Sequence, residues 1–181
     1  MKIKKIDYFA LHSLILNPIL NGMAFFYTDV FYENQTHIGN SLHHPIYYFF
    51  WSLSTVFGFY YYSKMIWDHF NLNYSIRVHR ILCLFLFLSI FIPYYPDGSA
   101  ILNDIHVWIA IGCTGSFFGE WIYLGTMTIL STYKETYGYF MVMAFGIFLL
   151  FFFGHVTSIC EIAFSCLSSI YLWCWWKKLA R

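Results

Sequence analysis

Apolar runs separated by short polar loops dominate the sequence. Six of these runs approach the stretch of about 20 mostly apolar residues that an α-helix needs to cross a membrane. They cover residues 8–27, 45–63, 79–93, 104–131, 138–154 and 158–176. The pattern predicts an all-α fold, a polytopic bundle of six transmembrane helices that forms a single domain over residues 1–181.

The boundary between the last two predicted helices depends on a turn. The apolar stretch from residue 138 to residue 176 is too long for one crossing. Gly154, His155 and Ser158 are the residues within it that favour a break in the helix. We therefore expect a short turn at these residues and a separate helix on each side of it.

The composition indicates that this chain folds in lipid. Of its 181 residues, 60% are hydrophobic and 10% are charged, whereas a soluble domain has about 25% charged residues. The net charge of +1 provides no basic patch, which excludes a nucleic-acid partner. The five cysteines lie inside apolar runs, so we expect them to pack as small side chains without forming disulfides. They are Cys83, Cys113, Cys160, Cys166 and Cys174.

The ten Lys and Arg residues determine the predicted orientation. With six spans, all of them fall before the first helix, between the second and third, between the fourth and fifth, or after the sixth. Because short cytoplasmic loops retain Lys and Arg, we expect both termini in the cytoplasm and a multi-pass protein of the plasma membrane. The basic residues are Lys2, Lys4, Lys5, Lys64, Arg77, Arg80, Lys134, Lys177, Lys178 and Arg181.

Aromatic residues cluster where the predicted helices would meet the lipid headgroups. Tyr and Trp are enriched at membrane–water interfaces, where one end of each ring is apolar and the other is polar. We therefore expect these clusters to be interfacial anchors. They are Tyr47, Tyr48 and Trp51 on the outer side, and Tyr60, Tyr61, Tyr62, Trp67, Trp173, Trp175 and Trp176 on the inner side.

Small and polar residues within the spans predict how the helices pack. Gly115 and Gly119 have the G-x-x-x-G spacing that lets two helices approach closely, which favours tight packing inside the bundle. Asn17 and Asn21 lie one turn apart with Pro18 between them. This arrangement predicts hydrogen bonds between helices or a kink in the first helix.

Five of the eight histidines map to the predicted outer side. Asp104 and Glu161 lie near the same side. Ionisable groups at or below the membrane surface are costly unless they are paired or hydrated, and they commonly mark a functional site. We therefore expect an outward-facing pocket that binds its ligand through His44, His106, His155, Asp104 and Glu161. The five outer histidines are His37, His43, His44, His106 and His155.

Other interpretations of these residues stay open. A transition metal could be held by His44, His106 and His155, and two of them could ligate haem, although no His-Glu-x-x-His motif is present. In the simpler interpretation, the loop histidines are solvated and Asp104 is a helix N-cap. The same outer side carries an N-glycosylation sequon, Asn34-Gln35-Thr36.

Glu120 is a carboxylic acid well inside the fourth predicted helix. It lies sixteen residues after Asp104, about 24 Å along the helix axis, and no cation lies in its own helix. Two interpretations stay open. Glu120 is either a protonated acid bonded to Ser116 one turn away, or part of a proton path.

Short motifs accompany the turns between residues 40 and 125. They are His44-Pro45, the segment Ile92-Pro93-Tyr94-Tyr95-Pro96-Asp97, and Asp104-Ile105-His106 followed by Ala110, with Ser41 as a loose counterpart of a loop serine. Together with the six spans, these motifs make the chain similar to the DRAM/Frag/Sfk-like membrane proteins and their uncharacterised prokaryotic relatives. The resemblance implies a helical bundle with an outward-facing polar pocket, and a role in lipid handling or membrane trafficking.

Three hypotheses of function follow. The leading one is a pocket that binds or handles a lipid headgroup or a small polar ligand. The runner-up is a metal- or histidine-dependent intramembrane hydrolase or acyltransferase, with His106 as base or ligand, Asp104 orienting it and His155 as a further catalytic candidate. The third is a proton-coupled transporter that uses Glu120 and Glu161. The expected partners are membrane lipids, and a second copy of the chain or another membrane protein is left open.

Overall fold

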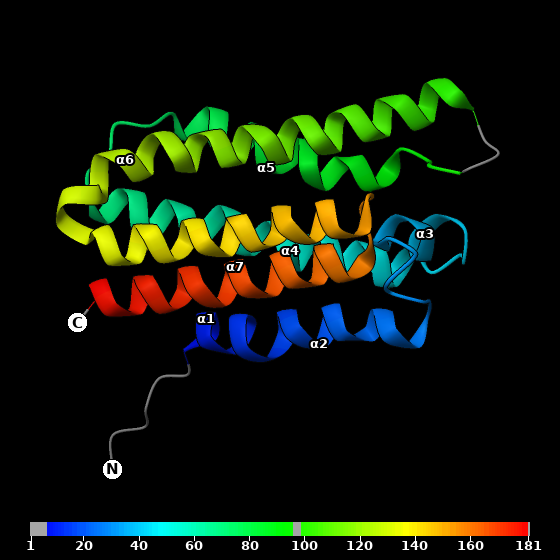
Figure 1. The fold of residues 1–181 in the computed structure, drawn as a ribbon, viewed down its shortest axis with the longest axis horizontal. Coiled ribbons are helices and arrows are strands. Elements are labelled where there is room, and N and C mark those ends of the chain that lie inside the picture. Colours follow the sequence, from blue (N-terminus) through cyan, green and yellow to red (C-terminus); the bar gives the residue numbers. More distant parts are fainter. Residues whose placement is uncertain (1–6, 96–98, 181) are drawn as a thin grey trace, which may run out of the picture.

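The computed structural model describes residues 7–95 and 99–180, apart from the side chains of residues 128–133. The described part is helical and contains no strand, which confirms the all-α prediction. Its long helices run side by side in an elongated bundle (Figure 1).

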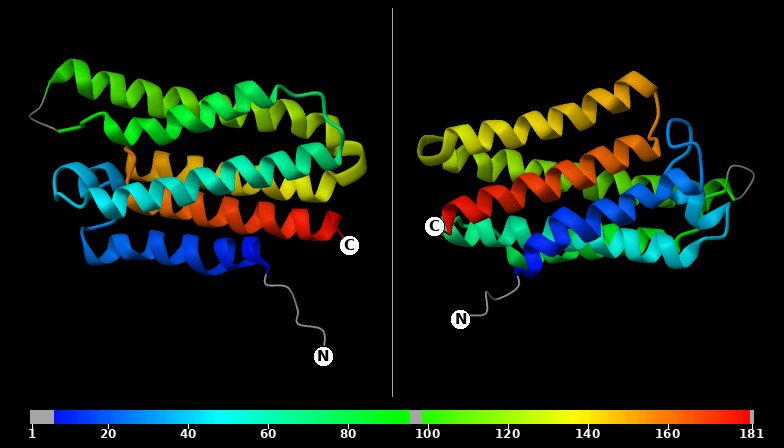
Figure 2. Two further views of the ribbon diagram at one scale, coloured as in Figure 1. Left: turned by 180° about the vertical axis from the view of Figure 1, so that it is seen from behind. Right: turned by 90° about the horizontal axis from the view of Figure 1, so that it is seen from below.

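The helix at residues 8–26 is continuous but changes its winding along its length. It comprises α1 (Tyr8–Leu11), the π-helical turn η1 (His12–Leu16), α2 (Asn17–Gly22) and the 3₁₀ turn η2 (Met23–Phe26). The Asp7 side chain caps its start by accepting a hydrogen bond from the Ala10 amide at 3.1 Å. Pro18 has no amide hydrogen to donate to the helical ladder, and a local π or 3₁₀ winding can re-satisfy the backbone groups that such a gap frees. This helix packs against both α4 and α7 (Figure 2).

Helices α3 to α5 differ from the predicted segments mainly at their ends. α3 (Gln35–Asn40) is a short helix inside the first loop, where none was predicted. α4 (Pro45–His69) extends past the predicted end at residue 63. α5 (Ile76–Leu88) begins earlier than predicted and continues as the 3₁₀ turn η3 (Ser89–Phe91).

α6 (Ala100–Phe153) is helical throughout but reverses direction. A straight helix would separate Trp121 from Tyr139 by about 27 Å, whereas their ring centroids are 4.5 Å apart. Figure 1 shows the reversal at the end of the ribbon's green-to-yellow section. α6 therefore has a first arm, Ala100–Met127, and a second arm, Lys134–Phe153. The predicted turn at 154–157 is present, with Gly154 at a φ of 74°, before α7 (Ser158–Leu179).

Four helical segments in the described part of the chain are long and apolar enough to cross a membrane. They are Tyr8–Phe26, Ala100–Met127, Lys134–Phe153 and Ser158–Leu179. Helices α4 and α5 are not among them. α5 has 13 residues, which is about 20 Å of helix. Large apolar side chains such as Trp108, Phe151 and Phe152 are exposed on the outside of the bundle, as expected where lipid is the solvent.

The helix ends fall into two groups at opposite ends of the bundle. At one end, which we call the cationic end, Lys177 pairs with Asp7 and Lys178 pairs with Glu135. The two ends of the described chain and the reversal of α6 therefore lie together there (Figure 1). The other end, which we call the loop end, carries the connecting residues 27–44, 92–95, 99 and 154–157.

The Lys and Arg residues that the structure describes all belong to segments near the cationic end. They are Lys64, Arg77, Arg80, Lys134, Lys177 and Lys178. Predicted features at Lys2, Lys4, Lys5, Pro96, Asp97 and Arg181 lie outside the described residues. The hydrogen bond from Lys177 holds the pKa of Asp7 below its usual value. This contact therefore stabilises the fold above the unfolded-state pKa and is lost as pH falls through the lowered one, but as an exposed pair it contributes little.

Aromatic side chains fill the core of the bundle. Trp121 contacts Trp67 and Trp175 at centroid distances of 5.4 and 5.6 Å near the cationic end. The prediction of interfacial anchors is wrong for the residues that are buried here, because their side chains pack inside the bundle. Trp51 Nε1 also finds a polar partner there and donates to Asn21 Oδ1 at 2.9 Å. The buried aromatic residues that were predicted as anchors are Tyr47, Tyr48, Trp51, Tyr62, Trp67 and Trp175.

The predicted close packing at Gly115 and Gly119 is also wrong. A Cβ atom at either position would meet nothing within 4 Å, so these glycines face open space. The close approach occurs instead between α4 and α7, where a Cβ on Gly58 would lie 2.6 Å from Ser169 Oγ. The glycine spacing in the sequence did not reveal which face of the helix meets a neighbour.

Candidate functional site

A cavity of about 430 Å³ lies between α4, the end of α5 with η3, both arms of α6, and α7. Its wall toward the cationic end is apolar. Phe59 and Phe118 each contact Phe164, with ring centroids 5.2 and 5.1 Å apart. Hydroxyl groups of Ser52, Thr55 and Ser165 line the middle of the cavity. The volume is in the range of small-molecule sites, which are mostly apolar with a few placed polar groups.

The polar groups gather where the cavity approaches the loop end. Thr36 Oγ1 lies 2.9 Å from the Tyr48 hydroxyl and 3.4 Å from His106 Nε2. His106 Nδ1 lies 2.9 Å from the carbonyl oxygen of Ile92. Because a carbonyl only accepts, Nδ1 carries the hydrogen, and in the neutral ring Nε2 is an acceptor facing Thr36. All three side chains are buried.

Glu161 completes this polar group from the first turn of α7. Its Oε2 accepts a hydrogen bond from the Gln35 amide at 2.8 Å. Its Oε1 has no hydrogen-bond partner in the described part of the chain. The start of a helix favours a carboxylate because the helix dipole is positive there. Glu161 therefore presents one unengaged oxygen at the cavity wall.

The first loop is held against α7 by backbone hydrogen bonds, and this positions Thr36. The Ser158 amide donates to the Glu33 carbonyl at 2.6 Å, and the Ile159 amide donates to the Val30 carbonyl at 2.9 Å. These amides at a helix start have no partner within their own helix. The loop carbonyls satisfy them and fix the start of α3 beside the cavity.

The structure separates several residues that the sequence predicted to share one pocket. His44 lies outside the cavity and packs on Tyr27, with ring centroids 4.3 Å apart. His155 is exposed, and its Nε2 lies 2.9 Å from the Tyr32 carbonyl. Asp104 is exposed and does not orient His106, because residues two apart on a helix do not face each other. Of the five predicted ligand-binding residues, only His106 and Glu161 line the cavity.

The predicted metal ligands are engaged in separate contacts. The ring nitrogens of His106 contact Ile92 and Thr36, whereas the ring of His155 reaches the backbone of the first loop. Among the residues that the structure describes, no group of three or more His, Cys, Asp or Glu is arranged to hold a metal ion. His37 lies 3.5 Å from Glu33, and His43 adopts a φ of 58°, so both belong to the loop.

The three residues of the N-glycosylation sequon, Asn34 to Thr36, have structural roles in the fold. Asn34 Oδ1 accepts from the His37 amide at 2.9 Å and caps α3. Gln35 and Thr36 are buried. In the folded chain Thr36 is therefore part of the cavity wall, and the Asn34 side chain caps the short helix beside it.

A second polar site lies between α5 and the first arm of α6. His79 Nδ1 is 2.9 Å from Glu120 Oε2, and His79 Nε2 is 3.3 Å from the Tyr60 carbonyl oxygen. His79 is fully buried and Glu120 is 18% exposed. The expected bond from Glu120 to Ser116 is replaced by this contact with a neighbouring helix. Because Nε2 must donate to the carbonyl, Nδ1 and the carboxyl group share one further proton.

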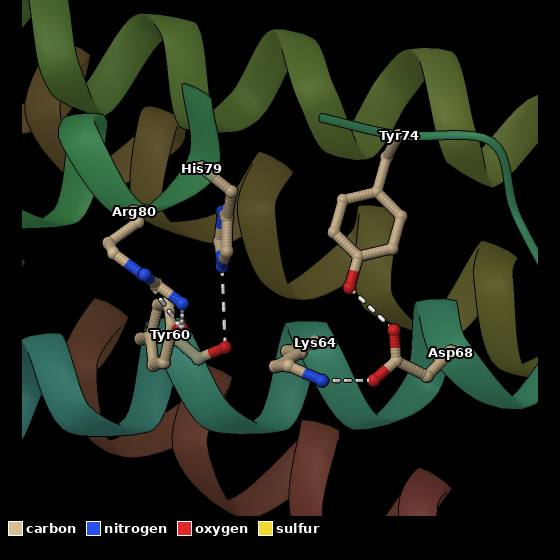
Figure 3. A network of polar contacts seen from close by, with 6 residues as sticks. All are labelled: Tyr60, Lys64, Asp68, Tyr74, His79 and Arg80. Carbon is tan, nitrogen blue, oxygen red and sulfur yellow. Dashed lines mark hydrogen bonds and ion pairs between the residues drawn. The ribbon is translucent and has the colours of Figure 1, made fainter. Parts of the chain in front are cut away.

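Figure 3 shows His79 of this pair with Tyr60 and Arg80, and the neighbouring contacts of Asp68. The guanidinium of Arg80 donates to the Tyr60 hydroxyl at 3.3 and 3.4 Å. Two turns beyond Tyr60 on α4, Asp68 accepts from Lys64 and, at 2.6 Å, from the Tyr74 hydroxyl. Partial burial raises the pKa of Asp68, but these two hydrogen bonds outweigh it and lower the pKa overall.

A third polar cluster joins the N-terminal helix to α4 and α7. Asn17 Nδ2 lies 3.2 Å from Ser165 Oγ, and Asn21 Nδ2 lies 2.8 Å from the Asn17 carbonyl. His12 Nδ1 lies 2.9 Å from the Tyr62 hydroxyl. The prediction of hydrogen bonds between helices at Asn17 and Asn21 is confirmed.

The sequence interpretation missed His12, His79 and Thr36. His12 was available as a signal, because an ionisable residue within a predicted span suggests a partner in another helix. His79 stood at a predicted helix start, where a solvated histidine would be ordinary. Nothing in the sequence indicated that Thr36 would be buried.

Comparisons with protein-family models, with curated proteins and with solved structures found no match. The function is therefore inferred from the chain's own residues.

Proposed function

We propose that this chain is a membrane protein of the plasma membrane with six spans, both termini in the cytoplasm, and a cavity that binds an amphipathic ligand through its polar headgroup. In this arrangement α4 and α5 cross the membrane together with the four more apolar segments. The loop end faces outward, because Lys and Arg are retained in cytoplasmic segments.

The observation that carries the proposal is the division of one cavity into an apolar and a polar part. Phe59, Phe118 and Phe164 form its apolar wall, while His106 and Glu161 lie near its loop end. A lipid has the same division, with a chain that is favoured among apolar side chains and a headgroup that needs hydrogen-bond partners. The resemblance to lipid-handling membrane proteins agrees with this proposal.

Filling the cavity tests the proposal. Gly115 lines the cavity and has no atom within 4 Å of its Cβ position. We expect Gly115→Leu to fold normally and to lose most of the lipid that copurifies with the wild-type chain, as measured by native mass spectrometry. Gly119→Leu is the matched control, because Gly119 is equally open but does not line the cavity. Equal lipid retention in both variants and in the wild type would contradict the proposal.

A proton-coupled transporter is a second candidate, favoured by the buried His79–Glu120 pair. A carboxyl group that shares a proton with a histidine inside a bundle can hold or release that proton. Glu120→Gln keeps the shape of the protonated acid but cannot exchange a proton. We expect this variant to abolish proton flux in liposomes containing a pH-sensitive dye. Undiminished flux would remove this candidate and leave the binding proposal intact.

A further inference from the structure

The polar part of the cavity contains a carboxylate and no balancing cation. Glu161 Oε2 is engaged by the Gln35 amide, and Oε1 has no partner in the described chain. The other polar groups here are the hydroxyls of Thr36 and Tyr48 and the ring of His106. The hydrogen on His106 Nδ1 is already used by the Ile92 carbonyl. A ligand that reaches Glu161 would therefore meet an oxygen that can only accept when ionised.

The distribution of charge makes this carboxylate selective. The Lys and Arg residues in the described part of the chain belong to segments near the cationic end, away from Glu161 at the start of α7. A buried carboxylate is costly unless it is paired. The helix dipole and one amide offset only part of that cost. A cationic headgroup would supply the missing charge, whereas a phosphate or carboxylate headgroup would be repelled.

The size of the cavity limits the apolar part of the ligand. Its volume of about 430 Å³ holds about fourteen groups of the size of a water molecule, which each occupy about 30 Å³. The volume therefore suits one chain of about this many methylene groups. The apolar wall of Phe59, Phe118 and Phe164 offers such a chain its contacts.

We infer that the cavity is selective for a single-chain amphiphile with an amine headgroup, whose ammonium group donates hydrogen bonds to Glu161 Oε1 and to a hydroxyl oxygen at Thr36 or Tyr48. This inference rests on the proposed ligand-binding function and names the chemical class of the ligand. The ammonium and the carboxylate form a charge-assisted pair in a site with little water, where such a pair is strong.

Three probes that have the same fourteen-carbon alkyl chain and differ only in the headgroup test the inference. Tetradecylamine, tetradecanol and tetradecanoate are titrated against the purified protein in nanodiscs, with protein-free nanodiscs as the blank. Binding is followed by the part of the tryptophan fluorescence change that is lost in Trp51→Phe. We expect the amine to bind about tenfold to a hundredfold more tightly than the alcohol, and the carboxylate to bind most weakly. Trp51 serves as the reporter because it lines the cavity.

Variants then assign the selectivity to one carboxylate. Glu161→Gln is expected to reduce amine affinity by about tenfold or more and to leave alcohol affinity unchanged. Glu33→Gln is the matched control, because Glu33 is a carboxylate at the same end that does not line the cavity. Equal binding of amine and alcohol to the wild type, or equal weakening of both in Glu161→Gln, would overturn the amine selectivity while the binding function stands. Absence of binding by all three probes, with lipid retained by Gly115→Leu, would overturn both.

Discussion

The hydrogen-bond partner of each ring nitrogen determines whether a buried histidine donates or accepts at that nitrogen. At His106, the Ile92 carbonyl fixes the hydrogen on Nδ1 and leaves Nε2 as an acceptor beside Thr36. At His79, the Tyr60 carbonyl takes the hydrogen of Nε2 and leaves Nδ1 against Glu120. Backbone carbonyls of neighbouring segments thus orient both rings. The predicted role of Asp104 in orienting His106 is filled by Ile92.

The His79–Glu120 pair gives a prediction for stability. His79→Ala removes a fully buried ring and leaves Glu120 without its partner, so we expect the free energy of unfolding to fall by about 3–5 kcal/mol. Glu120→Gln keeps a neutral partner that can donate to His79 Nδ1 and is expected to cost less than about 1 kcal/mol. The measurement is unfolding in mixed detergent micelles with increasing sodium dodecyl sulfate.

A double variant separates the pair from simple loss of packing. In the His79→Ala background, Glu120→Gln removes the unpaired carboxylate, so the double variant should be more stable than His79→Ala alone. If the effects of the two substitutions add without interaction, the two residues are not coupled and the pairing is wrong.

At the scale of helices, polar side chains and one glycine fix the contacts between the N-terminal helix, α4 and α7. Asn17 Nδ2 contacts Ser165 Oγ and Ser169 Oγ on α7, at 3.2 and 3.3 Å. Ser54 on α4 donates to Asn17 Oδ1 at 2.9 Å. Gly58 allows α4 to approach Ser169 closely. Within lipid, hydrogen bonds and small residues of this kind drive helix association, because apolar burial alone does not distinguish a neighbour from lipid.

A substitution at Gly58 tests how much the close contact between α4 and α7 contributes to stability. Gly58→Ala would place a methyl group 2.6 Å from Ser169 Oγ and displace that hydroxyl from Asn17, so we expect a loss of about 1–3 kcal/mol from overpacking. Gly119→Ala faces open space and should be neutral or gain about 0.5–1 kcal/mol from helix propensity. Thermal unfolding in detergent measures both.

Repeating Gly58→Ala in a Ser169→Ala background tests whether contact with the Ser169 hydroxyl causes the loss of stability. The nearest remaining atom of the side chain at position 169 is then Cβ, 3.6 Å from the added methyl group. The cost of Gly58→Ala should therefore shrink in this background. An unchanged cost would show that the contact with Ser169 is not responsible.

At the scale of the whole molecule, the two ends of the bundle differ in chemistry. The described Lys and Arg residues belong to segments near the cationic end, and the described termini meet there through the Lys177–Asp7 pair. The loop end carries the polar part of the cavity. Cytoplasmic retention of Lys and Arg predicts that the cavity's polar groups face outward.

Labelling from one side of the membrane tests this orientation. Ala100→Cys lies at the loop end and Lys178→Cys at the cationic end, each in a background in which the five native cysteines are replaced. An impermeant thiol reagent applied to intact cells should label Ala100→Cys only, and Lys178→Cys should react after permeabilisation. Labelling of both from the same side in intact cells would refute the proposed topology.

The sequence by itself determined the apolar segments, the turn at 154–157 and the separation of Lys and Arg from the histidines of the loop end. These features follow from hydropathy and loop charge, which are local properties that can be read along the chain. The described helix starts at residues 8, 45 and 158 match the predicted ones. The free state of all five cysteines was predicted in the same way.

Only the tertiary structure decided which side chains meet. His79 and Glu120 are 41 residues apart in sequence, and Thr36 and His106 are 70 apart. Their contacts depend on the rotation of each helix about its axis. An apolar segment surrounded by lipid has little amphipathic pattern to define that rotation. For the same reason, the sequence placed the buried aromatic residues at the interface and a close helix contact at Gly115, and the packed helices reversed both assignments.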